Sequence, residues 1–336
     1  MILAWTQFLL LGAVVAVAAS WLSHYGDVIA ERTGLSGSWI GLVLMATVTS
    51  LPELVSGVSA VRLEAAPDLA VAHILGACVL NLLLLSVVDL FYRPACMFVR
   101  ASQGHALTLG FSAAMLSIVG LGLAAPAAVP GLPLSVATLL IVPVYLLALR
   151  STFTFERRQL LEPVEPATAK YPHITLRRAG VGYAAAAAGV VAAALLLPGA
   201  AVGLADAMGW SDSLVGSLFL AAVTSLPEAV VTLAAVRIGV LDMAFANLLG
   251  SNLFNMVILA VDDVAYARAP LLSSVSDGHM TTVLVALLMT GIVTAGLVYR
   301  PNGRVRGAVS WASLALVAAY LLNAWLLFAG QPAASP

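Results

Sequence analysis

Long apolar segments separated by short polar connections dominate the chain. A helix that spans a bilayer needs about 20 mostly apolar residues, and by that measure the pattern predicts ten transmembrane helices. Their approximate limits are residues 3–22, 37–62, 69–91, 104–124, 130–150, 179–198, 212–236, 243–265, 279–299 and 307–329. The expected fold class is therefore an all-α polytopic membrane protein.

Two of the predicted spans share one sequence pattern. Gly41–Arg62 reads GLVLMATVTSLPELVSGVSAVR, and Gly216–Arg237 reads GSLFLAAVTSLPEAVVTLAAVR, at an offset of 175 residues. A carboxylate near the centre of a membrane helix costs at least about 2.5 kcal/mol on insertion scales, so it indicates a functional site. Glu53 and Glu228 occupy matched positions, so the chain bears this cost in both repeats. We therefore interpret both as site residues rather than as structural hydrogen-bond partners.

The distribution of charge adds an orientation to this picture. The chain is 62% hydrophobic and 9% charged, and its net charge of -1 gives no indication of a nucleic-acid partner. If the N-terminus lies outside, 13 of the 15 lysine and arginine residues fall on the cytoplasmic side, as the positive-inside rule requires. We therefore expect an integral plasma (inner) membrane protein with both termini outside.

The longest polar connection, residues 151–178, is too short to form a domain with its own core. It follows the fifth predicted span, and because five is odd, the two halves must enter the membrane in opposite senses. This predicts a first five-helix repeat over residues 1–150, a cytoplasmic linker over 151–178 and a second five-helix repeat over 179–336. Inverted repeats are typical of secondary transporters, in which the substrate site lies near the midplane where the halves meet.

The repeated TSLPE pentapeptides place oxygen ligands beside a helix break. Proline removes a backbone donor and displaces the carbonyl four residues earlier. Irregular backbone at membrane depth is tolerated only where it lines a cavity or is buried in protein. Hard cations such as Ca²⁺ prefer carboxylate, carbonyl and hydroxyl oxygens. The candidate ligands are Thr49, Ser50, Glu53, Thr224, Ser225 and Glu228.

A second polar cluster follows each pentapeptide. In the second half, NLLGSNLFN places four polar residues on or beside one helix face: Asn247, Ser251, Asn252 and Asn255. In the matching first-half segment, HILGACVLN, the positions equivalent to Asn247, Ser251 and Asn255 are His73, Ala77 and Asn81. The second half therefore offers more oxygen ligands than the first. Interhelical hydrogen bonding is the alternative role for these amides and for His73.

Taken together, these motifs resemble the cation/calcium exchanger superfamily, which includes sodium/calcium exchangers. The resemblance covers spans two, three, seven and eight, and it implies ten helices with both termini outside. It also implies that Glu53 and Glu228 bind Ca²⁺. The further ligands that it implies for Ca²⁺ or Na⁺ are Thr49, Ser50, Thr224, Ser225, Asn81, Asn255 and Ser251, with His73, Asn247 and Asn252 as candidate modifiers.

This chain departs from the family pattern in its first half. Ala77 replaces an expected serine, Cys78 an expected asparagine and His73 another asparagine. Fewer oxygen ligands weaken Na⁺ coordination, whereas protons need only the carboxylates, and His73 adds a titratable group. The expected function is a secondary antiporter that exchanges Ca²⁺ for Na⁺ or H⁺ by alternating access. The transported ions are its only expected cofactors, and we expect a monomer.

Other functions stay open at this point. An intramembrane metalloprotease would need a motif such as HExxH, which is absent, and the absence of GxxxxGK[ST] argues against ATP-driven transport. A serine hydrolase built on Ser50 and His73 would leave the paired Pro-Glu elements unused, so we expect no enzyme. A proton-coupled transporter of another cation, or a non-transporting relative with a degraded first-half site, is the alternative.

Several other ionisable residues fall outside these motifs. Asp89, Asp262 and Asp263 fall near predicted helix ends, where we expect wet structural roles. His105 and His279 lie near predicted span edges and receive no role.

Overall fold

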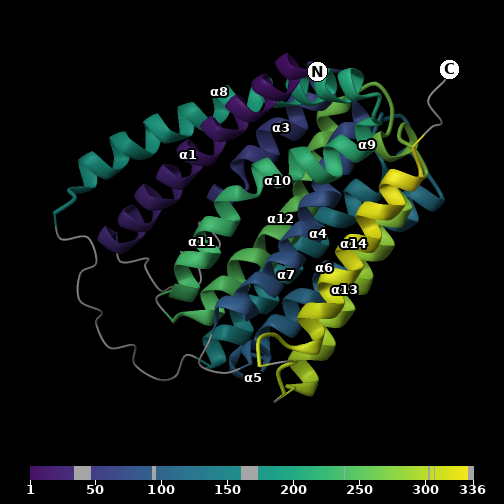
Figure 1. Ribbon diagram of the computed structural model, residues 1–336. Coiled ribbons are helices and arrows are strands. Elements are labelled where there is room, and N and C mark those ends of the chain that lie inside the picture. Colours follow the sequence, from purple (N-terminus) through teal and green to yellow (C-terminus); the bar gives the residue numbers. More distant parts are fainter. Residues whose placement is uncertain are drawn as a thin grey trace.

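The computed structural model of the protein describes residues 1–33, 47–92, 96–159, 173–237, 239–301, 303–305 and 307–331. Over these residues the chain is almost entirely helical (Figure 1). Eight of the helices are long and apolar enough to cross a membrane, or nine if the bent pair Asp212–Thr224 and Leu226–Arg237 is one span. The predicted span 37–62 lies partly outside the described residues, so the count of ten stays a prediction.

The helices follow the predicted repeat. The first half contains α1 (Ile2–Arg32), α3 (Leu51–Arg62), α4 (Pro67–Phe91), the short α5 (Met97–Arg100), α6 (Gly104–Ala124) and α7 (Val136–Gln159). The second half contains α8 (Leu176–Met208), α9 (Asp212–Leu214), the π-helix η1 (Val215–Leu220), α10 (Ala221–Thr224), α11 (Leu226–Arg237), α12 (Leu241–Tyr266), the 3₁₀ turn η2 (Leu271–Ser273), α13 (His279–Tyr299) and α14 (Trp311–Ala329). At the repeat offset, α1, α3, α4, α6 and α7 correspond to α8, α11, α12, α13 and α14.

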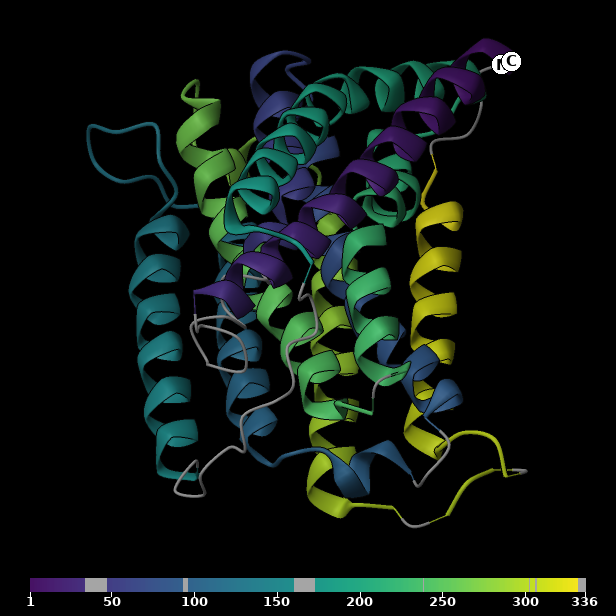
Figure 2. The same cartoon turned by 90° about the vertical axis from the view of Figure 1, so that its left-hand side faces the viewer.

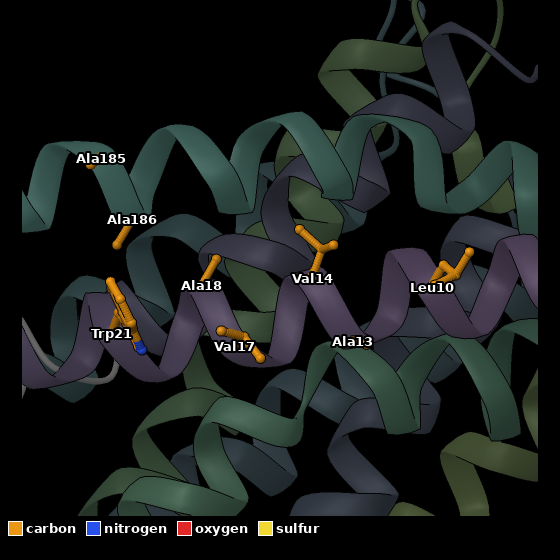
Figure 3. A pocket seen from close by; sticks show the side chains of 8 residues that line it. All are labelled: Leu10, Ala13, Val14, Val17, Ala18, Trp21, Ala185 and Ala186. Atoms are coloured by element: carbon orange, nitrogen blue, oxygen red, sulfur yellow. The ribbon is translucent and has the colours of Figure 1, made fainter.

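Helices α1 and α8 are longer than their predicted spans, with 31 and 33 residues. They pack against each other and cross the other helices obliquely (Figure 2). A tilted helix needs more residues to cross the same thickness of hydrocarbon. An apolar groove of about 500 Å³ runs between them, lined by Leu10, Val14, Trp21 and alanines of α8 (Figure 3). These large side chains are exposed and apolar, which is typical of a surface that contacts lipid.

Reciprocal contacts show how the two halves are related. Asp68 Oδ1, at the start of α4, lies 2.8 Å from His279 Nε2 at the start of α13. Asp242 Oδ1, at the start of α12, lies 3.0 Å from His105 Nε2 at the start of α6. The two contacts join equivalent residues with the halves interchanged, as expected if the halves are related by a pseudo-two-fold axis. The second of these contacts places the start of α12 beside the start of α6. Because α6 begins shortly after α4 ends, α12 starts at the face where α4 ends. The two helices therefore run in opposite directions, and the repeats are inverted.

Two buried carboxylates tie each half to a helix start in the other half. Asp89 Oδ2 accepts a hydrogen bond of 2.6 Å from the backbone N–H of Ser310, which precedes α14. Asp263 Oδ2 accepts one of 2.7 Å from the N–H of Ser135, which precedes α7, and its Oδ1 accepts one of 2.6 Å from Leu271. Both side chains are at most 1% exposed, so the expectation of wet roles was wrong. These carboxylates satisfy backbone donors that a helix start leaves without partners.

Replacing Asp263 by asparagine should lower the thermal stability of the protein in detergent. The amide NH₂ would face a backbone N–H, and losing hydrogen bonds to a charged acceptor costs about 1.5–3 kcal/mol. Thermal unfolding followed by tryptophan fluorescence measures this effect. Asp277→Asn, on an exposed residue before α13, is the matched control and should leave the midpoint unchanged. Equal midpoints for the two variants would contradict the role given to Asp263.

Candidate cation-binding site

Two helix breaks place the repeated pentapeptides inside the bundle. Ser50 and Ser225 have almost the same backbone angles, φ -87° and ψ 12° for Ser50 and φ -83° and ψ 6° for Ser225. Pro52 and Pro227 follow in the first turns of α3 and α11, where a missing N–H leaves no helical hydrogen bond unmade. The segments on either side of Ser225 meet at 46°. Each pentapeptide therefore starts a new helix with a glutamate in its first turn.

Each glutamate accepts a hydrogen bond from the serine of the opposite half. The Ser50 hydroxyl donates to Glu228 Oε1 at 3.0 Å, and the Ser225 hydroxyl donates to Glu53 Oε1 at 3.1 Å. All four side chains are at most 1% exposed. Within the described ranges, neither carboxylate has a lysine or arginine partner. The breaks therefore bring two buried carboxylates to one place, with hydroxyl groups as their only described side-chain donors.

The polar stripe of α12 extends this cluster. The Ser251 hydroxyl donates to Glu228 Oε1 at 3.4 Å. The Asn247 amide donates to the Glu228 backbone carbonyl at 3.2 Å, so two members of the stripe contact the same residue. Asn255, the third member, is 1% exposed. The Asn255 amide lies 3.8 Å from Cys78 Sγ on α4, so the predicted helix face contacts both the second pentapeptide and α4.

Helix α4 faces the cluster from the other half. The Asn81 amide donates to Asn252 Oδ1 at 3.0 Å, and the Asn252 amide donates to the Cys78 carbonyl at 3.2 Å. His73 Nε2 lies 2.9 Å from Thr224 Oγ1 on α10. Asn252 and His73 thus make the interhelical hydrogen bonds that were the alternative to a role at the site.

The structure brings all twelve predicted site residues to this crossing of α3, α4, α10, α11 and α12. None is more than 4% exposed, and none lies on the surface. The twelve are Thr49, Ser50, Glu53, His73, Asn81, Thr224, Ser225, Glu228, Asn247, Ser251, Asn252 and Asn255.

Several buried oxygen atoms at the crossing have no hydrogen-bond donor. Among the described residues, Glu53 Oε2, Glu228 Oε2, Asn81 Oδ1 and Asn255 Oδ1 are buried without a hydrogen-bond partner. Buried polar atoms are normally hydrogen-bonded, so acceptors without donors need an explanation. Carboxylate, amide and hydroxyl oxygens are the donor set of a hard cation such as Ca²⁺. The two halves contribute one carboxylate and one amide each.

The site is not symmetric in its hydroxyl groups. Glu228 Oε1 accepts hydrogen bonds from two serine hydroxyls, whereas Glu53 accepts one, from Ser225. The missing partner corresponds to Ala77, which occupies in the first half the position of Ser251 in the second. The difference between Ala77 and Ser251 therefore changes the number of serine hydroxyl groups that contact each central glutamate.

A π-helix that the sequence did not predict positions the second break. The Ser217 hydroxyl in η1 donates to the Ala72 carbonyl in α4 at 3.0 Å. The backbones approach so closely that a Cβ on Gly76 would lie 2.3 Å from the Ser217 carbonyl oxygen, and one on Gly216 would lie 2.7 Å from that of Leu69. Short π-helical segments occur often at functional sites. The two glycines were the only signal of this contact in the sequence.

The Asp–His pairs at the ends of the bundle were also missed. His105 and His279 received no role, although each bonds an aspartate of the opposite half. Their offset of 174 residues equals that of Asp68 and Asp242. This shared offset is the signal that would have paired them.

The chain is similar to known proteins over nearly its whole length. A family model described as sodium/calcium exchanger protein matches residues 3–151 and 179–329. The putative antiporter CaxA of Alkalimonas amylolytica is 27% identical over 333 residues, which cover 96% of this chain and 98% of the relative. The inner membrane protein YrbG of Escherichia coli (strain K12) is 29% identical over 278 residues, which cover 78% and 83% of the two chains.

Solved structures share the fold. The H⁺/Ca²⁺ exchanger CAX superposes with a TM-score of 0.72 at 17% identity, over 97% of this chain and 85% of the other. The sodium-calcium exchanger NCX_Mj superposes with a TM-score of 0.62 at 22% identity, over 96% and 97%. The chain belongs to the sodium/calcium exchanger protein family, within the cation/calcium exchanger superfamily of secondary transporters.

Proposed function

We propose that this protein is a secondary antiporter that exchanges Ca²⁺ for Na⁺ or H⁺ at the crossing of the two helix breaks, with Glu53 and Glu228 as the central ligands. One observation carries the proposal: oxygen acceptors from both halves are buried at one place without hydrogen-bond donors. The family comprises cation exchangers, and relatives of known structure include a proton-coupled and a sodium-coupled calcium exchanger.

The ligand set suits competition between ions of different charge. Two carboxylates carry the charge that balances one Ca²⁺, which takes 6–8 oxygen ligands in proteins. Na⁺ ions or protons bound to the same carboxylates balance that charge equally well. If only one kind of occupant fits at a time, and the site opens to one face at a time, the gradient of one ion drives the other.

The position of the halves supports a cycle of this kind. Each carboxylate is held by a hydroxyl group of the opposite half, so a movement of one half against the other changes both carboxylates together. Because the halves are inverted, the same contacts can open toward either face. One chain supplies both halves of the site, so a monomer suffices for transport.

The same proposal places the protein in the plasma membrane with both termini outside. Rings of Trp5 and Phe328, near the two ends of the chain, lie 6.3 and 6.2 Å from the ring of Trp210, so both ends reach one face. The sequence predicts that most basic residues fall in connections at the opposite face, which the positive-inside rule makes cytoplasmic. A tag added at the C-terminus should be accessible to antibody on intact cells. Accessibility only after permeabilisation would contradict this orientation.

Ala77→Ser should increase the dependence of Ca²⁺ uptake on Na⁺. The new hydroxyl would stand where Ser251 stands in the second half and would give Glu53 a second serine hydroxyl as a neighbour. Net gains from one such contact are about 0.5–1.5 kcal/mol, which corresponds to a two- to tenfold lower Na⁺ concentration for half-maximal uptake. Uptake into proteoliposomes over a range of Na⁺ concentrations measures the change. Ser251→Ala is the matched variant and should shift the curve the other way; parallel, unshifted curves would contradict the role of this position.

Uptake of ⁴⁵Ca²⁺ into proteoliposomes tests the function itself. The protein is reconstituted and given a Na⁺ gradient in one series and a pH gradient in another, with empty liposomes as the control. Uptake under one gradient supports antiport and names the coupling ion. No uptake under either gradient contradicts calcium antiport and favours another cation or a non-transporting relative.

A further inference from the structure

Asp262 on α12 is a buried carboxyl group that the proposed site does not use. It is 0% exposed, and both Oδ1 and Oδ2 lack a hydrogen-bond partner in the described part of the chain. Its neighbour Asp263, by contrast, is held by hydrogen bonds to the start of α7 and to Leu271. Buried side-chain oxygens are usually bonded, so a carboxyl group with two unbonded oxygens requires a reason.

The carboxyl group lies in the interface between α12 and α3. A Cβ built on Gly57 would be 2.4 Å from Asp262 Oδ2 and 2.7 Å from Oδ1, so the absence of a side chain at Gly57 makes room for it. Gly57 follows Glu53 by four residues and therefore lies on the same face of α3, about 6 Å further along the helix. Asp262 follows Asn255 by seven residues and shares its face of α12. The position of Asp262 continues the polar stripe from the central crossing toward the end of α12.

Only one half of the chain has this carboxyl group. The position equivalent to Asp262 in the first half is Val88, and the position equivalent to Gly57 in the second half is Thr232. Thr232 Oγ1 accepts a hydrogen bond of 3.1 Å from the Asn247 amide. The pair Asp262 and Gly57 therefore corresponds by the repeat to the pair Val88 and Thr232. The first pair includes an unpaired carboxyl group, whereas the second has an aliphatic side chain and a hydrogen-bonded hydroxyl group.

Among the residues that the structure describes, no basic side chain is paired with Asp262. Elements packed against α12 are α3, α4, α6, α7, α11 and η2. Their described ionisable groups nearest to the interior are Glu53 on α3, His73, Cys78 and Asp89 on α4, His105 on α6, Tyr145 on α7 and Glu228 on α11. None of these forms a hydrogen bond or ion pair with Asp262. Arg62, at the end of α3, is exposed.

The occupant that fits this environment is a proton. An isolated ionised carboxylate is very costly in a low-dielectric interior and is neutralised by binding a cation. Ca²⁺ needs 6–8 oxygen ligands, and no polar group of the described residues lies within hydrogen-bonding distance of either Asp262 oxygen. A single carboxyl group beside a glycine can bind H⁺ and needs no further ligand.

We propose that Asp262 is a proton-binding site of this protein, on the side of the central crossing that leads to the end of α12. The carboxylic acid releases H⁺ to become a carboxylate, and the proton passes to water at that face or to a central carboxylate. The reverse step reprotonates it. A role of this proton in transport rests on the proposed antiport, whereas proton binding by Asp262 does not.

Infrared difference spectroscopy of the purified protein tests proton binding directly. At neutral pH, wild type should show the C=O stretching band of a protonated carboxylic acid that is absent from Asp262→Asn, which keeps the shape of the side chain. Asp277→Asn removes an exposed carboxylate and should leave the band in place. Asp262→Val copies Val88 of the other half, so it provides a second variant if asparagine disturbs folding. Identical spectra for wild type and both Asp262 variants would overturn the proposal.

The transport assay tests the use of the proton. Uptake of Ca²⁺ driven by a pH gradient should fall by about 10²-fold in Asp262→Asn, the lower end of what a positioned proton donor contributes. Equilibrium binding of Ca²⁺ should be retained, because the central ligands are unchanged. An unchanged rate and pH profile in Asp262→Asn would contradict a role in transport. If wild type shows the infrared band but no uptake under any gradient, the proton site stands and the antiport proposal fails.

Discussion

Gradient-driven Ca²⁺ uptake falls by about 10²–10⁴-fold when either Glu53 or Glu228 is replaced by glutamine, because removing one partner from a buried set of charges costs about 3–5 kcal/mol. Glutamine keeps the size of the side chain and can still accept the serine hydrogen bond. It removes the negative charge that balances the cation. The two variants should therefore fold normally and fail in transport.

The reciprocal contacts predict that both variants are affected to a similar degree. Each glutamate lies at the same place in its own repeat and accepts a hydrogen bond from the opposite serine. The matched control is Glu64→Gln, the same substitution on an exposed residue just beyond α3. It should transport like wild type. Full activity in either Glu53→Gln or Glu228→Gln would contradict a site shared between the halves.

Gly76→Ala should destabilise the protein strongly, although it adds a single methyl group. That carbon would lie 2.3 Å from the Ser217 carbonyl oxygen and 2.5 Å from the Ser217 Cα, both of which belong to the backbone of η1. The contact cannot be relieved by rotating a side chain, so α4 and η1 must separate. Overpacking of this kind costs about 1–3 kcal/mol, and the shift would also move Ser225 away from Glu53. The expected result is a lower unfolding midpoint together with reduced uptake.

The control for this substitution is Gly110→Ala, in the exposed face of α6. A Cβ at Gly110 has no neighbour within 4 Å. Alanine in a helix interior is favoured over glycine by about 0.5–1 kcal/mol, so this variant should be as stable as wild type or slightly more so. Size-exclusion chromatography and thermal unfolding in detergent compare the two. A Gly76→Ala protein as stable as the Gly110→Ala protein would show that the close approach of α4 and η1 is absent.

The repeat made the organisation of the fold predictable. Two TSLPE segments at a constant offset imply two equivalent helix breaks, and an odd number of spans per half implies inversion. Helix lengths were harder to predict, because the hydropathy of a segment does not reveal how far its helix tilts in the membrane. The prediction for α1 ended at residue 22, where serine and histidine follow, yet the oblique helix continues to Arg32.

The composition of the candidate site was predictable, but its contacts were not. Spacing along one helix placed Asn247, Ser251 and Asn255 on a single face. Which carboxylate each of them would meet depends on how the halves pack, and no local pattern encodes that. The π-helix η1 was missed for the same reason, since a register change within an apolar segment leaves hydropathy unchanged.

Aspartates near helix ends show where sequence reasoning failed. A position close to the end of an apolar segment predicts contact with water. Asp89, Asp262 and Asp263 are instead buried between helices of both halves, two of them as partners for backbone N–H groups. Burial at a helix end depends on what the neighbouring loop covers, and that is a property of the tertiary structure.

Equilibrium binding of ⁴⁵Ca²⁺ to the purified protein tests the location of the cation site without any assumption about gradients. Wild type should bind Ca²⁺ in competition with Na⁺ or H⁺, and the Glu53→Gln, Glu228→Gln double variant should lose this binding. Binding of Ca²⁺ by the double variant with the affinity of wild type would contradict the assignment of the site to the crossing of the two helix breaks.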